Sequence, residues 1–281
     1  MKEYYFLFAL AFLFTLFASI QDLKKREVAN WLNFSFIAFA LSYRAFYSLA
    51  AKNFQFFLFG ILGFAIFFIL AHALYYAKAF AGGDAKLLMG FGIILPYTSY
   101  KSLIILPPVF LFALFLVGAI YSLLYSIIIV AKNKQKFKKE LSRYFKKYKF
   151  TLTTTILLSI ASLFLAFISS LVIPLFILFL IPLIYAYTKS LENCMIKFYS
   201  YNKLTEGDWL EKNIKLSSSI TIKKTVHGLS KKDIKLLKKY KRNVLIKEGI
   251  PFIPAFFITL IIMVFFFLTS PALPSLLSFL S

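Results

Sequence analysis

The chain has 281 residues, of which 60% are hydrophobic and 36 are Phe, and its formal net charge is +22. This composition is too apolar for a water-soluble domain, and several stretches approach or exceed the roughly 20 residues that cross a bilayer. The single cysteine, Cys194, excludes an internal disulfide and a multi-cysteine zinc site. A polytopic membrane protein without a structural metal is therefore predicted.

Seven apolar stretches follow one another along the chain, at 4–20, 31–51, 54–77, 85–97, 103–131, 150–188 and 250–269. The first is read as a retained helix, because no small-residue cleavage site follows it. The sixth, with 39 residues, would form a helix of roughly 58 Å, nearly twice the bilayer thickness, so it is expected to fold into two helices that turn near Ser169 and Ser170. The predicted fold class is all-α and polytopic, with about eight transmembrane helices and a small cytoplasmic α+β subdomain.

The basic residues test this count, because Lys and Arg concentrate in cytoplasmic loops. With eight spans and the amino terminus outside, the segments 21–30, 78–86, 132–149 and 189–249 fall on the cytoplasmic side and hold 29 of the 33 basic residues. A single helix over 150–188 would instead place the 15 basic residues of 189–249 outside. The charge distribution therefore favours the helix hairpin.

The positive charge is assigned to anionic lipid headgroups. It is concentrated beside the spans, chiefly in 132–149 and 189–249, where each basic residue near a membrane surface contributes about 1 kcal/mol of attraction. No recognised nucleic-acid-binding motif accompanies the charge, so nucleic acid is not an expected partner.

Four regions are predicted along the chain. A membrane core covers residues 1–131, a basic cytoplasmic loop and helix hairpin cover 132–188, a small cytoplasmic subdomain covers 189–249, and a carboxy-terminal transmembrane helix and tail cover 250–281. Within the subdomain, 214–222 is rich in Ser, Thr and Ile and predicts a strand, while Ser230 opens an amphipathic helix. Pro251 suits the first turn of the last helix.

Two carboxylates are the candidate functional groups. Asp22 follows the first apolar stretch and Asp84 precedes the fourth, so each lies where a helix leaves the lipid, and ionisable groups are costly there. Two facing carboxylates can hydrolyse a peptide bond, because one ionised group takes a proton from water while the other, protonated, polarises the carbonyl. Structural interpretations compete: Asp84 also suits a helix N-cap, and Asp22 also suits a solvated surface.

The surrounding motifs resemble those of the prepilin and preflagellin peptidases, a family of membrane aspartic proteases, especially its archaeal branch. Residues 22–30, Asp-Leu-Lys-Lys-Arg-Glu-Val-Ala-Asn, are similar to the family's first motif, and residues 81–86, Ala-Gly-Gly-Asp-Ala-Lys, are similar to its Gly-x-Gly-Asp-x-Lys motif. The resemblance implies that Asp22 and Asp84 are catalytic. It also implies that the remaining motif residues bind substrate or shape the site, namely Asn30, Gly82, Gly83 and Lys86.

Two positions depart from the family pattern: Ala29 replaces the usual Pro, and Ala81 stands where the first Gly is expected. We expect these changes to alter loop rigidity more than chemistry. The segments 204–209, 227–230 and 246–254 resemble the carboxy-terminal region of archaeal members, whereas the four-cysteine metal loop of bacterial relatives is missing. No cofactor or metal is therefore expected.

The predicted function is removal of the short basic leader from type IV pilin-like or archaellin-like precursors, which carry a class III-type signal peptide, at the cytoplasmic face of the cell membrane. Two alternatives remain open. One is a proton- or ion-coupled transporter that uses the same carboxylates, although transporters place such groups near the midplane of internal repeats. The other is an assembly protein with an inactive peptidase fold.

Four further polar residues are interpreted structurally. Asp208 follows a Gly in a polar segment, which is typical of a turn. His72 and His227 are far apart in the sequence and give little support to a metal site. Arg44, near the outer end of the second span, is expected to extend to the interface.

Overall fold

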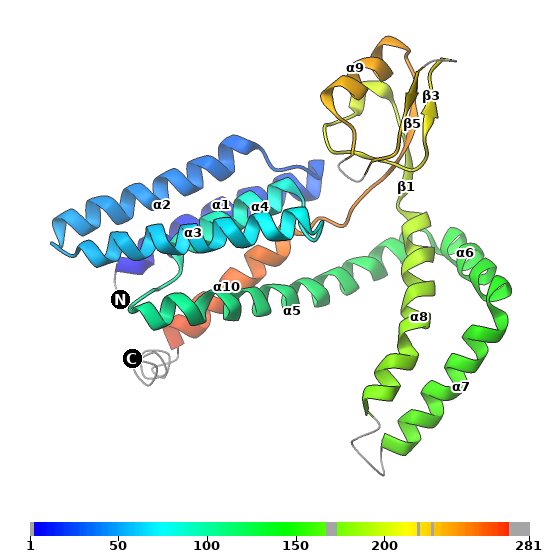
Figure 1. Cartoon of the computed structure of the whole chain (residues 1–281), viewed down its shortest axis with the longest axis horizontal. Coiled ribbons are helices and arrows are strands. Elements are labelled where there is room, and N and C mark those ends of the chain that lie inside the picture. Colours follow the sequence, from blue (N-terminus) through cyan, green and yellow to red (C-terminus); the bar gives the residue numbers. More distant parts are fainter. Residues whose placement is uncertain (1–2, 167–172, 218–219, 226–227, 270–281) are drawn as a thin grey trace. The chain divides into compact units, whose positions relative to one another are not determined.

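The structure is a computed structural model that describes residues 3–166, 173–217, 220–225 and 228–269. The chain forms two compact units (Figure 1). The first contains residues 1–123 and 251–281, and the second contains residues 124–250. The first unit therefore combines both ends of the sequence, whereas the four predicted regions each cover one continuous segment.

The first unit is helical. Its helices are α1 (Glu3–Lys25), α2 (Asn30–Ala50), α3 (Phe54–Tyr76), α4 (Gly82–Ile94), the first part of α5 (Tyr100–Lys132) and α10 (Ile253–Thr269). Helix α4 packs between α2 and α3, and α10 packs along α1 (Figure 1). The first five helices follow the predicted apolar stretches to within a few residues.

Helix α4 lies at the centre of this unit. Leu87, Leu88, Phe91, Ile93 and Ile94 are each at most 1% exposed. Residues on all sides of the helix are buried, as expected for a helix that is apolar all round.

Helices α3 and α4 approach each other closely at a pair of glycines. A Cβ atom added at Gly63 would collide with the carbonyl oxygen of Gly92, and one added at Gly92 would collide with that of Gly63. Small residues at such a contact let two helix backbones meet, as is common among membrane helices. The α3–α4 contact therefore requires glycine on both helices.

Four described helices are long and apolar enough to cross a membrane, namely α1, α3, α5 and residues 175–194 of α8. A fifth span is possible if the bent pair formed by α6 and α7 counts as one. This supports a polytopic membrane protein but does not confirm the predicted eight spans. Helix α4, with 13 residues, is only about 20 Å long and is too short to cross the roughly 30 Å hydrocarbon layer alone.

The second unit joins three further helices to a small mixed subdomain. Helices α6 (Lys134–Lys147), α7 (Lys149–Ala166) and α8 (Ile173–Cys194) come first, and α7 lies beside α8 (Figure 1). Residues 134–147, predicted as loop, are helical because their apolar side chains recur at helical spacing. The predicted turn at Ser169 and Ser170 lies outside the described residues.

The subdomain has two antiparallel sheets, the 3₁₀ turn η2 (Tyr201–Lys203) and helix α9 (Lys231–Lys239). One sheet has the order β1 (Ile196–Tyr199), β5 (Val244–Lys247) and β2 (Trp209–Leu210), and the other pairs β3 (Ile214–Lys215) with β4 (Thr221–Ile222). The register pairs Phe198 with Leu245 and Lys197 with Ile246. Its core brings together Leu237 of α9 and Val244 and Ile246 of β5.

Two sequence predictions for the subdomain can be compared with these elements. The predicted strand at 214–222 is a hairpin of β3 and β4. The helix expected after Ser230 is present, and the Ser230 hydroxyl accepts a hydrogen bond from the backbone N–H of Asp233, which is the capping interaction that the sequence indicated. Pro251 lies two residues before α10, just outside the first turn in which it was predicted.

Candidate functional site

Asp22 lies in the last turn of α1 and is 7% exposed. Its carboxylate oxygen Oδ2 accepts a hydrogen bond of 3.0 Å from the backbone N–H of Ile253, the first residue of α10. The first N–H groups of a helix have no partner within that helix and carry a partial positive charge. The partial positive charge at the amino-terminal end of α10 therefore stabilises the Asp22 carboxylate. The partial negative charge at the carboxy-terminal end of α1 would by itself destabilise that carboxylate.

The loop after Asp22 is held by local hydrogen bonds. The backbone N–H of Arg26 donates to the carbonyl of Asp22 at 2.9 Å, and Arg26 has a φ of 58°, a left-handed conformation that ends the helix. The Gln21 side chain then accepts from the N–H of Ala29 at 3.0 Å. The chain turns in this way into α2, which begins at Asn30.

Asp84 lies in the first turn of α4 and is partly exposed. Its oxygen Oδ2 accepts a hydrogen bond of 3.1 Å from the backbone N–H of Ala81, the residue before the helix. The capping interpretation of Asp84 is therefore correct in kind, although the residue occupies the third helical position rather than the N-cap. One carboxylate oxygen suffices for this contact, so capping does not exclude a chemical role.

The two sequence motifs are neighbours in the first unit. Lys86 Nζ donates to Asn30 Oδ1 at 2.6 Å, and Asn33 Nδ2 donates to the carbonyl of Gly83 at 3.4 Å. Gly83 also lies against Val28. These contacts join the start of α4 to the start of α2.

Through these contacts the start of α4, which carries Asp84, lies beside the loop that follows Asp22. Two carboxylates that repel each other in a partly desolvated place cannot both ionise cheaply and tend to share one proton. An arrangement that brought the two carboxylates together would therefore hold an acid and a base side by side.

Arg44 is the main residue that the sequence interpretation misplaced. Its side chain is fully buried, and its three nitrogens donate to the carbonyls of Ile93, Phe56 and Leu95 at 2.7, 2.6 and 2.9 Å. The prediction that Arg44 extends to the interface is wrong, because these carbonyls provide polar partners inside the unit.

Two of the acceptor carbonyls lie at the carboxy-terminal end of α4. Helix α4 ends at Ile94, and Leu95 adopts an extended conformation before Pro96, as expected for a residue that precedes proline. The last carbonyls of a helix have no partner within it. Arg44 supplies that partner and fixes the end of α4 opposite to Asp84.

The other singled-out residues do not join this site. Asp208 accepts hydrogen bonds from the backbone N–H and the hydroxyl of Thr205, which is the predicted turn, and burial raises the pKa of its carboxyl. His72 hydrogen-bonds the Phe68 carbonyl on its own helix, and His227 lies outside the described residues. Among the residues described, no three His, Cys, Asp or Glu side chains gather as metal ligands would.

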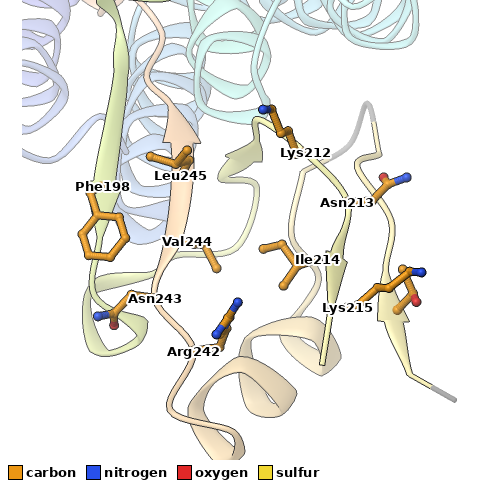
Figure 2. Close-up of a pocket in the computed structure, with 10 residues that line it drawn as sticks. Phe198, Lys212, Asn213, Ile214, Lys215, Arg242, Asn243, Val244 and Leu245 are labelled. Atoms are coloured by element: carbon orange, nitrogen blue, oxygen red, sulfur yellow. The ribbon is translucent and has the colours of Figure 1, made fainter. Parts of the chain in front are cut away.

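An open depression of about 520 Å³ lies on the subdomain of the second unit (Figure 2). Lys212, Lys215 and Arg242 line it together with apolar residues that include Phe198 and Leu245. None of the predicted site residues lines this depression.

Comparison with known proteins places the similarity on the first unit. Residues 9–123 match the type IV leader peptidase family. A preflagellin peptidase of Methanococcus voltae is 37% identical over 101 residues, which are 34% of this chain and 42% of that protein. A preflagellin peptidase of Methanocaldococcus jannaschii is 35% identical over 81 residues, which are 29% of this chain. One of Methanococcus maripaludis is 27% identical over 124 residues, which are 41% of this chain.

The matched regions cover only 34% to 54% of these relatives' lengths. No solved structure is similar to the chain at a significant level. The family match contains both Asp22 and Asp84 and the motifs around them. The similarity to the type IV leader peptidase family therefore lies in residues 9–123, the region in which the two aspartate motifs predicted it.

Proposed function

We propose that the protein is a membrane aspartic endopeptidase that removes the short basic leader from pilin-like or archaellin-like precursors. The observation that carries this proposal is that the motifs containing Asp22 and Asp84 lie within the family-matched region and are joined by the hydrogen bond from Lys86 to Asn30. The names of the relatives, all preflagellin peptidases, support precursor processing as the reaction. The family match covers residues 9–123, and we propose this activity for the whole chain.

In the proposed reaction, the ionised carboxylate of the pair takes a proton from a water molecule while the protonated carboxyl donates a hydrogen bond to the scissile carbonyl oxygen. The water oxygen bonds to the carbonyl carbon, and the carbon–nitrogen bond then breaks as the leaving nitrogen receives a proton from the pair. Because the two groups share one proton, the acid and base roles belong to the pair. The N–H groups of Ile253 and Ala81 keep the two side chains oriented.

Substrate would lie beside Gly82 and Gly83. A Cβ at Gly82 or Gly83 would meet nothing in the chain closer than 3.6 Å, so the packing of the protein itself does not require glycine there. A bound main chain that approaches the helix start closely would require it. We therefore expect Gly83→Ala to fold normally and to raise KM or lower kcat, as measured with a purified precursor.

The proposed orientation follows from charge. With eight spans and the amino terminus outside, Asp22 and Asp84 face the cytoplasm, where a basic leader stays when the hydrophobic helix of its precursor inserts. Position-specific cysteine labelling from each side of the membrane tests this orientation. Labelling of residue 27 from the outside only would refute it.

The decisive experiment replaces each aspartate separately. Asp22→Asn and Asp84→Asn, each co-expressed with a precursor, are expected to abolish cleavage, because asparagine cannot take up or release the shared proton. Glu27→Gln is the matched control, since Glu27 is an exposed carboxylate in the same loop, and it should leave cleavage unchanged.

Cleavage that survives both aspartate replacements would refute the peptidase. Flux of protons or ions that is lost in the same variants, without any processed precursor, would support the transporter instead. Neither activity in the wild-type protein, tested with several precursors, would favour an assembly role.

A further inference from the structure

Helix α6 and its surroundings form a basic amphipathic element that the peptidase site does not use. Residues 132–149 carry nine basic residues and one acidic residue. The apolar and aromatic residues recur at spacings of three and four, and they are Phe137, Leu141, Tyr144, Phe145 and Tyr148. Such spacing places them on one side of a helix, with cations on the other.

Helix α6 is nearly perpendicular to α7, the helix that follows it. The axes of α6 and α7 differ by 94° across a break at Tyr148. Helices α7 and α8 lie side by side, and α6 lies across one end of this pair (Figure 1). If the pair crosses the bilayer, a helix at a right angle to it lies in the plane of the membrane surface.

Side-chain contacts fix α6 to the end of α8. Asn193 Nδ2 donates to Glu140 Oε2 at 2.9 Å, and the rings of Phe137 and Tyr187 lie 5.5 Å apart. These contacts use only part of the apolar side. Phe145 and Tyr148 remain 36% and 44% exposed.

The cations of α6 have few protein partners. Arg143 pairs with Glu140 at 2.8 Å, whereas the lysines between 132 and 149 form no ion pair among the described residues. A helix with exposed aromatic residues on one side and unpaired lysines on the other matches the chemistry of an anionic bilayer surface.

We propose that α6 lies in the headgroup layer of an anionic leaflet, with Phe145 and Tyr148 inserted towards the acyl chains and the lysines at the phosphates. The bilayer is preferred to an acidic protein because a single residue separates α6 from α5 on one side and from α7 on the other, namely Asn133 and Tyr148. A span that ends at the surface delivers α6 directly to the headgroups. This proposal does not depend on the peptidase activity.

The test uses the full chain in proteoliposomes made of phosphatidylcholine alone or of equal parts phosphatidylcholine and phosphatidylglycerol. The chain has two tryptophans, Trp31 and Trp209, so Trp→Phe at both removes the background. Phe145→Trp then adds one probe on the apolar side, and Lys139→Trp is the matched control about 120° further round the same helix.

We expect lipids with brominated acyl chains to quench tryptophan at 145 several times more strongly than at 139, and acrylamide in water to show the opposite preference. The difference should be larger with phosphatidylglycerol and should decrease in high salt. Tyr148→Trp repeats the measurement if the first variant does not fold.

Equal quenching of positions 145 and 139 by either reagent would overturn the proposal. Protection of position 145 from both reagents would also overturn it, because a protein surface rather than lipid would then cover the helix.

Discussion

Arg44→Met is expected to destabilise the first unit by about 3–5 kcal/mol. The substitution leaves three buried carbonyls, those of Ile93, Phe56 and Leu95, without their donors, and each orphaned acceptor costs about 1–3 kcal/mol. The loss is smaller than the simple sum, because methionine no longer carries the cost of burying a cation. Arg44→Lys should fall between wild type and Arg44→Met, since one ammonium group cannot span three separated acceptors as a guanidinium does.

Unfolding by titration with sodium dodecyl sulfate measures this difference. Trp31 lies in α2, the helix that carries Arg44, so its emission in a Trp209→Phe background reports on the first unit. If all three side chains at position 44 gave the same transition, the hydrogen bonds of Arg44 would contribute nothing to stability and the reasoning would be refuted.

A double-mutant cycle with Gly60 tests the same contact from the opposite side. A Cβ at Gly60 would collide with Arg44 Cδ, so Gly60→Ala should cost about 1–3 kcal/mol in the wild-type protein, as overpacking does. In an Arg44→Ala background the collision disappears, and Gly60→Ala should be neutral or stabilising by up to about 1 kcal/mol, because alanine favours a helix. Strictly additive effects of the two substitutions would contradict the predicted contact.

Two further predictions concern packing and the site. Gly63→Ala should destabilise the first unit by about 1–3 kcal/mol, because the added Cβ would meet the rigid carbonyl of Gly92. Gly249→Ala is the control, since a Cβ there would meet nothing within 4 Å, and it should leave the same titration unchanged. Equal effects of the two substitutions would contradict the α3–α4 contact. Asn30→Ala removes the acceptor of the exposed hydrogen bond from Lys86, so it should change the free energy of unfolding by less than about 1 kcal/mol. It should also lower precursor cleavage in the co-expression assay. Full cleavage would exclude a role for the Asn30–Lys86 pair.

Most helices of the first unit could be predicted, because the sequence of each helix by itself indicates that it is helical. Apolar stretches of helical length, separated by short polar segments, define α1 to α5 to within a few residues. The amphipathic spacing of 134–147 was equally local, but its high charge led to a loop prediction. The number of spans could not be obtained in the same way, since α4 and α10 are shorter than a bilayer requires.

The candidate site was predictable only in part. Asp22 and Asp84 stood out because carboxylates at the ends of apolar segments are costly and because their neighbours match a family motif. The hydrogen bond from Ile253 to Asp22 joins residues 231 positions apart, and a backbone N–H group leaves no trace in the sequence. The same holds for Arg44, whose three acceptors are all main-chain carbonyls.

Helix α4 is short, but hydrogen bonds fix it at both ends, and this holds the Asp84 carboxylate in position. Lys86 and the carbonyl of Gly83 are held by α2 at one end, and Arg44 of the same helix holds the carbonyls at the other. Because both contacts come from α2, α4 can shift along its axis only if it breaks hydrogen bonds at each end. Asp84 therefore keeps its position relative to the loop that follows Asp22, as the proposed sharing of a proton between the two groups would require.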